Sequence, residues 1–423
     1  MEIHLPYGRG SLPVRLPNNL DVQVLEPPPA PGLPDEPAAL RHALQHPVGV
    51  PPMPAIVRPH DTVVIVFSDR TRPMPNERVL PALLRELAHV PDGQIVLLNA
   101  LGLHRSSPPE ELREMLGEEI VSRYRILQHD PHDSAAVQPL GQTRFGHPIA
   151  VNRAYVTATR RILTGFIEPH FFAGFSGGPK SVLPGIAGAG LILANHNAQM
   201  LAHPQAAWGV TQGNPVWQEM AEVCSRVPPD FLCNVTLNAQ RQITGVFAGQ
   251  WETAHRRGVE WARQHTTIPV DQPFDLVVTT NSGFPLDINL YQAVKGMSAA
   301  ARVVKPGGAI VMAAQCADGL PDHGGFRALL GLGRTPAEWL QALAAPGFSA
   351  VDQWEVQLLA QVLGKAEVWL KAEGLPDDDY ALAGVQRCDS VEETVVALAQ
   401  RYGPGARIAV LPQGPQAIPT LVG

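Results

Sequence analysis

The residues best suited to chemistry lie closest together in GFIEPHFFAGFSGGPKSVLPG, residues 165–185, which holds a histidine, a glycine-rich turn and one lysine. Gly174, Lys180 and Ser181 match the spacing of a phosphate-binding P-loop, in which a glycine also precedes the lysine. Here that position is Pro179, and proline has no N–H group and a fixed φ angle. The stretch is therefore not a P-loop, and the lysine needs another explanation.

Lysine is scarce in this chain. Only five of the 32 basic residues are lysines, so arginine supplies nearly all of the generic positive charge. A lysine kept against this background favours a role for its amine, as a nucleophile or as a compact donor. Lys180 and Lys295 lie inside glycine-flanked motifs, where this reasoning applies, whereas the last three lysines occupy ordinary surface-type positions.

Polar side chains follow several apolar runs that predict buried strands. The runs within 61–73, 93–105 and 160–170 each end in a polar tip, and 188–200 predicts a helix. Because the carboxyl ends of parallel strands meet at one edge of a sheet, we expect these tips to converge. The candidate residues are Asp69, Arg72, His104, His170, Lys180 and His196, joined from the second half of the chain by Gln292 and Lys295.

These residue types suit the handling of a small anion. Arg72 could hold a carboxylate through a bidentate fork, and Lys295 could do so as a point charge. His104 and His170 titrate near neutrality and could act as an acid/base pair. The backbone N–H groups of the FSGG turn could hold a phosphate. Each residue alone could equally be structural, and their joint placement is the argument for function.

His196 is a natural ligand for nickel, zinc or copper, but no second ligand stands at metal-binding spacing from it. One protein ligand cannot hold a metal tightly. If a metal binds, something other than protein must supply the remaining donors.

The elements that position these residues predict an α/β fold: two α/β domains with mainly parallel sheets and the active site in the interdomain cleft. We place the N-terminal cofactor-binding and catalytic domain at residues 1–270. The C-terminal domain, residues 271–423, would close over the site. Within the first domain, the proline-rich start predicts a surface arm with a short helix, and Asn76 is a plausible N-cap of the next helix.

Composition limits the class of protein. A chain of 423 residues with 45% apolar content can bury two cores. No apolar run is long enough to span a bilayer, and the start lacks the apolar core of a signal peptide. Four scattered cysteines and a net charge of −7 argue against a disulfide framework and against nucleic acid as the main partner. A cytoplasmic protein without a membrane partner is the expectation.

Six motifs together resemble the nickel-pincer lactate racemases: SDRTRP, GLHR, the long central stretch at 165–185, NHN, LYQAVKGM and DQWEVQ. The resemblance runs through both expected domains. It implies a nickel ion and the pyridinium-3,5-bisthiocarboxylic acid mononucleotide, joined to Lys180 through a thioamide. His196 would be the one protein ligand of the nickel, which explains the missing partner ligands.

The same resemblance implies roles for the other candidates. His104 and His170 would be the two acid/base groups that serve opposite faces of a 2-hydroxy acid, while the cofactor takes up and returns its Cα hydride. Gln292 and Lys295, with Arg72, would hold the substrate. The residues expected at the cofactor are Asp69, Arg70, Thr71, Arg72, Ser176, Gly177, Gly178, Lys180 and Trp354. Cofactor-synthesis proteins would be the protein partners.

Two other hypotheses remain at the level of sequence. One is a cofactor-binding or non-catalytic protein of the same fold. The other is a nucleotide-dependent enzyme, because VVKPGGAIVMAA faintly resembles a methyltransferase strand, although no glycine-rich turn opens a domain. The residues that would contact a substrate side chain lie outside the motifs, so the sequence does not select one 2-hydroxy acid.

Overall fold

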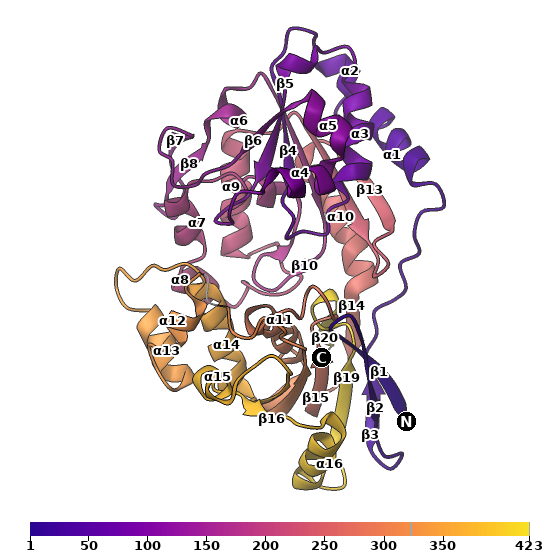
Figure 1. Ribbon diagram of the computed structural model, residues 1–423, viewed down its shortest axis with the longest axis vertical. Coiled ribbons are helices and arrows are strands. Elements are labelled where there is room, and N and C mark those ends of the chain that lie inside the picture. The colour runs from indigo at the N-terminus through magenta and orange to yellow at the C-terminus, as the bar shows by residue number, and fades with distance from the viewer. Residues whose placement is uncertain (322–323, 423) are drawn as a thin grey trace.

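The computed structural model describes residues 1–321 and 324–422, which form two α/β domains, one above the other in Figure 1. The first domain is built on a six-stranded sheet. All neighbours in it pair in parallel except the edge pair β13–β12. Its strands, in spatial order, are β13 (Ile243–Gly249), β12 (Phe231–Leu237), β9 (Arg160–Phe166), β4 (Val63–Ser68), β5 (Ile95–Ala100) and β6 (Arg125–Gln128).

The central strand β4 shows why this sheet is buried on both sides. Val63, Ile65 and Phe67 pack into a core with helices α1 and α3, while Val64 and Val66 face a second core on the opposite side. A continuous apolar run is what a strand with helices on both faces requires. The helices of this domain are α1 (Glu36–Gln45), α2 (Met53–Ile56), α3 (Asn76–Glu86), α4 (Pro109–Leu116), α5 (Glu118–Arg123), α6 (Arg153–Thr157), α7 (Ala189–Asn195), α8 (Ala198–Leu201), α9 (Pro215–Arg226) and α10 (Trp251–Thr266), with 3₁₀ turns η1 (Asp92–Gln94) and η2 (Gly178–Ser181).

The second domain has a sheet of six parallel strands. In spatial order they are β18 (Gln386–Arg387), β17 (Glu367–Lys371), β16 (Val304–Ala313), β15 (Phe274–Thr280), β19 (Arg407–Leu411) and β3 (Asp21–Val24). Its helices are α11 (Leu290–Ala300), α12 (Phe326–Leu330), α13 (Pro336–Leu343), α14 (Gln353–Lys365), α15 (Asp377–Ala383) and α16 (Val391–Tyr402), with the 3₁₀ turn η3 (Gly414–Gln416). The α/β fold with mainly parallel sheets is therefore confirmed.

The start of the chain differs from the expected surface arm. Strands β1 (Glu2–Tyr7) and β2 (Gly10–Arg15) form a hairpin, and β3 then pairs with β19 as an edge strand of the second sheet. Figure 1 shows these indigo strands beside the yellow β19, far from the rest of the N-terminal domain. Residues 2–24 thus pack with the C-terminal domain, although they fall within the predicted range 1–270. Pairing between strands nearly 400 residues apart leaves no local signal.

Helix α3 begins at the residue predicted to be its cap, one residue earlier than expected. Asn76 is the first helical residue, not the N-cap, and Pro75 holds the cap position. The buried Asn76 side chain donates from Nδ2 to the carbonyl oxygen of Ser68 at 2.9 Å. It therefore fastens the helix to the end of β4, and with it the polar tip that follows this strand.

Three further two-stranded sheets complete the fold: β7–β8 (Val137–Gln142 with Pro148–Asn152), β10–β11 (Pro169–His170 with Gly174–Phe175) and β14–β20 (Thr267–Val270 with Ile418–Leu421). The last pair joins the end of the first domain to the end of the chain. One apolar cluster also continues from the first domain into the second, so the two domains share part of their cores. The described cysteines are buried and free, and no described helix is long and apolar enough to cross a membrane.

Asp287 attaches the N-terminal hairpin to the second domain. Its buried carboxylate accepts hydrogen bonds from the backbone N–H groups of Gly8 (2.7 Å) and Gln315 (3.1 Å). We expect Asp287→Ala to lower the free energy of unfolding by about 2–3 kcal/mol, because two buried donors lose a charged acceptor. Urea denaturation measures this. Asp21→Ala, on the exposed side of β3, is the control and should change it by less than about 0.5 kcal/mol.

Candidate active site

A cavity of about 700 Å³ lies between the two domains and gathers most of the predicted site residues. The first domain contributes the tips that follow β4, β5 and β9, and the second contributes the starts of α11 and α14. The predicted residues that line it are Asp69, Thr71, Arg72, His104, His170, Ser176, Gly177, Lys180, His196, Gln292, Lys295 and Trp354. Strand ends therefore converge as the parallel sheet requires.

Two predicted cofactor residues are not among those that line the cavity. Arg70 lies in the same turn as Asp69 and Arg72, but its side chain pairs with Glu111 at 3.3 Å and is 60% exposed. Gly178 lies beneath the ring of His255, where a Cβ atom would stand 2.6 Å from ring carbons. The structure thus explains Arg70 as part of a surface ion pair and Gly178 as a close-packing position.

The turn after β4 orients the first histidine. His104 Nδ1 lies 2.7 Å from Asp69 Oδ2, and Thr71 Oγ1 donates to the other carboxylate oxygen at 2.8 Å. Burial opposes ionisation of Asp69, but the hydrogen bond and charge of His104 outweigh it and lower the pKa of this carboxyl. An ionised carboxylate only accepts, so the proton of His104 stands on Nδ1. In the neutral ring Nε2 then keeps a lone pair, as a general base requires.

His170 has the opposite arrangement. The backbone N–H of Ala173 donates to His170 Nδ1 at 3.3 Å, so the neutral ring carries its proton on Nε2. Burial, followed by the charges of Lys180 and Arg72, holds the pKa of His170 well below its usual value. The ring stacks on Phe171 with centroids 4.5 Å apart. His104 is thus set to accept a proton, whereas His170 is set to hold one.

His196 stands at the end of α7 with one nitrogen already used. Its Nδ1 lies 3.0 Å from the carbonyl oxygen of Ile192, which can only accept, so Nε2 is unprotonated in the neutral ring. Burial and the charge of Lys180 lower the pKa of His196 to about 3. The edges of Phe172 and Trp354 flank the ring. A metal-binding histidine needs this neutral form, with its other nitrogen donating to a carbonyl.

Three cationic side chains share the cavity. Burial, followed by the charge of Arg72, holds the pKa of Lys180 well below the usual lysine value. Lys295 donates from Nζ to Gln292 Oε1 at 2.6 Å, and its pKa is also lowered, mainly by burial. An uncharged lysine amine is a nucleophile. The cavity therefore favours the reactive form of Lys180 while it presents Arg72 and Lys295 to an anion.

Two buried carboxyl groups near these cations were not predicted as site residues. Glu168 precedes His170, and burial raises its pKa against the opposing charges of Arg72, Lys295 and Lys180. Glu355, next to Trp354, is fully buried with neither carboxyl oxygen hydrogen-bonded to a described residue. Burial raises the pKa of Glu355 to about 8, and the charge of Lys295 opposes this. Glu168 lies in the 165–185 stretch and Glu355 in the DQWEVQ motif, and this position within a motif was the only feature of the sequence that could have indicated them.

The glycine-rich turn does not offer all of its N–H groups to a phosphate. The N–H of Ser176 donates to the carbonyl oxygen of Glu168 at 2.9 Å, and the N–H of Gly178 donates to Asn234 Oδ1 at 2.8 Å. Gly177 lines the cavity and has φ +74°, a conformation that glycine adopts without strain. The turn thus shapes the wall beside Lys180, and only part of it faces the cavity.

Aromatic side chains form the apolar part of the wall, and sequence reasoning found only one of them. Trp354 donates from Nε1 to the hydroxyl of Tyr291 at 3.0 Å, which links α14 to α11. Phe171 and Phe172 line the opposite side. They directly follow His170 in the central motif, but an aromatic pair next to a strand is equally typical of a core, so nothing local distinguished them.

No group of three or more His, Cys, Asp or Glu side chains able to hold a metal ion is found in residues 1–321 and 324–422. His196, with Nε2 unprotonated in the neutral ring, has the form that a metal ligand needs. The donor set therefore fits a metal whose other ligands come from a bound organic group, and Lys180, which lines the same cavity as His196, has a lowered pKa that favours its reactive amine. The residues present are compatible with a tethered metal cofactor.

Fold and site together define a two-domain α/β protein whose interdomain site contains three histidines, His104, His170 and His196, and the buried Lys180. The family model for the lactate racemase N-terminal domain matches residues 7–209, and that for the lactate racemase C-terminal domain matches residues 270–418. The chain belongs to the lactate racemase family.

Individual relatives agree with this. The chain is 36% identical to the lactate racemase of Lactiplantibacillus plantarum over 382 residues, which is 90% of each chain. It is 35% identical over 368 residues to that of Thermoanaerobacterium thermosaccharolyticum, 85% of each. The solved lactate racemase apoprotein from the latter organism superposes with a TM-score of 0.93 at 32% identity, over 99% of this chain and 100% of the other. A Thermotoga maritima protein at 19% identity shares the fold, with a TM-score of 0.68 over 92% and 97%.

The lowered pKa of Lys180 predicts unusual reactivity. A lysine reacts with amine-selective reagents only as the free amine, so Lys180 should be labelled at a lower pH than the half-exposed Lys305. Arg72→Met removes a cation, raises the pKa of Lys180 and should move its labelling to higher pH. Peptide mapping of acetylation against pH measures both lysines in one sample. Equal pH dependence of Lys180 and Lys305 would contradict the electrostatic argument.

Proposed function

We propose that this protein is a racemase or epimerase of 2-hydroxy acids that uses a lysine-tethered nickel-pincer nucleotide and two histidine acid/bases. One observation supports this most: a single cavity brings together Lys180, His196 and the Asp69–His104 pair. Burial shifts Lys180 toward the free amine, and hydrogen bonds at Nδ1 leave Nε2 of His196 and of His104 unprotonated in the neutral rings. Membership of the lactate racemase family supports racemase activity for the chain.

The cofactor would be held by residues of the first domain. Lys180 would form the thioamide, His196 Nε2 would bind the nickel, and Gly177 and Ser176 would lie along the nucleotide. When bound, this group supplies the chemistry that takes a hydride from Cα of the substrate and returns it to either face of the planar 2-oxo acid. The cavity, at about 700 Å³, is within the range of pockets that hold ligands of this size.

The substrate would be held from the second domain and from the tip of β4. Arg72 and Lys295 would bind its carboxylate, and Gln292 would steady Lys295 through the 2.6 Å hydrogen bond. His104 Nε2 would accept the hydroxyl proton of one enantiomer, with Asp69 stabilising the imidazolium that results. His170 would serve the other enantiomer, and for this its ring proton must move from Nε2 to Nδ1.

The two domains would have different roles in the reaction. We propose that residues 1–270 carry the cofactor and both histidines, and that residues 271–423 close the cavity with Lys295, Gln292 and Trp354. Closure excludes water from the site, which protects a transferred hydride from solvent protons. A cofactor-binding protein without turnover remains the alternative. It is disfavoured by the preserved Asp69–His104 geometry, since binding alone needs no free base.

Substitutions of Lys180 and of His196 should affect different properties of the holoprotein: covalent attachment of the cofactor and nickel content. Lys180→Arg should abolish covalent cofactor retention, because a guanidinium group cannot form the thioamide. His196→Ala should keep the organic adduct and lose most of the nickel. Intact mass and metal analysis after co-production with the cofactor-synthesis enzymes measure both. An adduct retained in Lys180→Arg, or full nickel and turnover in His196→Ala, would refute the respective assignment.

The single variants of His104 and His170 should differ in which enantiomer of the substrate they can still oxidise. Each single variant, His104→Ala or His170→Ala, should lose racemisation in both directions, because each direction uses both groups in turn. In stoichiometric mixtures with Cα-deuterated enantiomers, each variant should still form the 2-oxo acid from one enantiomer only, and the two variants should prefer opposite ones.

The control is the parent protein with a panel of short, branched, aromatic, dicarboxylic and sugar-derived 2-hydroxy acids, which must first identify a substrate. With that substrate, near-parental turnover in either variant would show that its histidine is structural and that the two-base mechanism is wrong.

A further inference from the structure

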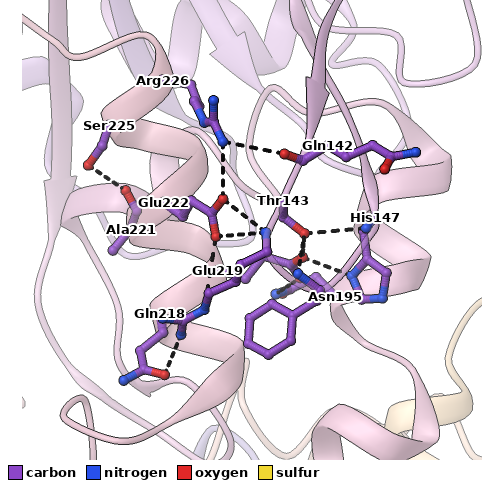
Figure 2. Close-up of polar contacts among 12 residues, drawn as sticks. Gln142, Thr143, His147, Asn195, Gln218, Glu219, Ala221, Glu222, Ser225 and Arg226 are labelled. Carbon is purple, nitrogen blue, oxygen red and sulfur yellow. Dashed lines mark hydrogen bonds and ion pairs between the residues drawn. The ribbon is translucent and has the colours of Figure 1, made fainter.

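A buried carboxylate outside the cavity forms a polar cluster around the helix that carries His196. Glu219, on α9, is fully buried and accepts three hydrogen bonds. Thr143 Oγ1 donates to Oε1 at 2.6 Å, His147 Nδ1 lies 2.8 Å from the same oxygen, and Asn195 Nδ2 donates to Oε2 at 2.9 Å. Figure 2 shows Glu219 at the centre of these contacts, between the β7–β8 turn and Asn195.

Asn195 is the residue directly before His196. Its side chain reaches back to α9 through both Glu219 and the carbonyl oxygen of Val216, which lies 3.2 Å from Nδ2. Asn197, directly after His196, instead caps α8 by accepting from the N–H of Met200. The three residues of the NHN motif therefore point to three different structures, and only the middle one faces the cavity.

The short helix α7 is held at both ends by these contacts. At its start, the N–H of Gly188 donates to the carbonyl oxygen of Ala150 on β8, and that of Ala189 donates to Pro131. At its end, Asn195 is bonded to Glu219, and the carbonyl oxygen of His196 accepts from Gln353 Nε2 of the second domain at 3.2 Å. A seven-residue helix has little rigidity of its own, so these contacts decide where His196 stands.

An ionised carboxylate is costly to bury unless every acceptor position is satisfied. Apolar packing would fasten a hairpin to a helix at lower cost. The carboxylate adds fixed geometry, since two oxygens join the β7–β8 turn and Asn195 at set distances. A lone protein ligand on a metal needs such fixing, because no neighbouring ligand corrects its position.

We propose that Glu219 is a positioning residue for His196 and acts through the side chain of Asn195. This inference rests on the proposed function only in naming His196 as the metal ligand. Glu219 itself touches neither cofactor nor substrate; it sets the end of α7, and thereby the direction of the His196 ring.

The chain offers a matched control on the same helix. Glu222 lies three residues after Glu219, but its side chain is 21% exposed, and it pairs with Arg226 at 3.5 Å and with Arg144 at 4.0 Å, both half-exposed. Glu219→Gln keeps the side-chain volume but leaves at least one of the three donors without a carboxylate oxygen. Glu222→Gln makes the same chemical change at a carboxylate whose described partners are Arg226 and, in the β7–β8 turn, Arg144, whose backbone N–H also donates to it at 3.0 Å.

The first measurement uses the apoprotein labelled with ¹⁵N-histidine, in which His196→Gln identifies the His196 ring signals. Glu219→Gln should shift or broaden those signals, and Glu222→Gln should leave them in place. Asn195→Ala provides a second variant, because it removes the link while leaving Thr143 and His147 bonded to Glu219. Unchanged His196 signals in both Glu219→Gln and Asn195→Ala would overturn the inference, since the cluster would then fasten only the hairpin.

The second measurement uses the holoprotein. Nickel should dissociate about tenfold faster from Glu219→Gln than from Glu222→Gln, the size of effect typical of groups that orient a metal ligand. The two measurements separate the hypotheses. A His196 ring that responds in a protein that binds no nickel sustains the positioning inference and refutes the proposed function. If instead the holoprotein binds nickel through His196 but the His196 signals do not change in the variants, the proposed function is sustained and the positioning inference is refuted.

Discussion

Enclosure of like charges in one cavity is the constraint on which the rest of this structure depends. Arg72, Lys180 and Lys295 lie around the same interdomain space, and burial together with mutual repulsion lowers the pKa of both lysines. Such a cluster is unfavourable unless it binds anions or loses a charge. In the proposed function, conversion of Lys180 into a neutral thioamide and binding of a carboxylate by Arg72 and Lys295 would relieve it. The polar groups are therefore arranged for what enters the cavity.

The two domains are needed together for this arrangement. The parallel strands of the first domain deliver His104 and His170 at their ends, the turn η2 adds Lys180, and α11 and α14 of the second domain complete the wall of the cavity. Side chains cross the boundary at several points: Trp208 Nε1 donates to Ser298 Oγ at 3.0 Å, and Gln353 bonds the backbone of His196. The apolar core is also continuous between the domains. Both walls of the site therefore belong to packed structure.

Carboxylates direct histidines in two ways here. Asp69 acts directly, since its hydrogen bond fixes the proton of His104 on Nδ1 and frees Nε2. Glu219 acts at one remove, through Asn195 and the end of α7. In both cases a buried carboxyl group is held by several hydrogen bonds, so its position is well defined. The function of a histidine in this protein is thus decided by a residue that does not react.

The sequence by itself determined the α/β class, the strand ends that carry the polar residues, and the motifs that place the chain in its family. It did so because these features are local. A continuous apolar run such as that of β4 predicts a strand buried on both faces of a sheet, and Pro179 excludes a P-loop because it has no N–H group, whatever its surroundings. Only the tertiary structure decided where side chains point. The side chain of Arg70 pairs with Glu111, and that of Asn76 bonds to the end of β4 in place of capping its helix. Residues 21–24 pair with the sheet of the second domain, and the N–H groups of Ser176 and Gly178 donate to protein acceptors. The tertiary structure also set the opposite ring states of His104 and His170 and brought Glu219 to Asn195. Each of these outcomes depends on contacts between residues far apart in the chain, whose geometry no local pattern records.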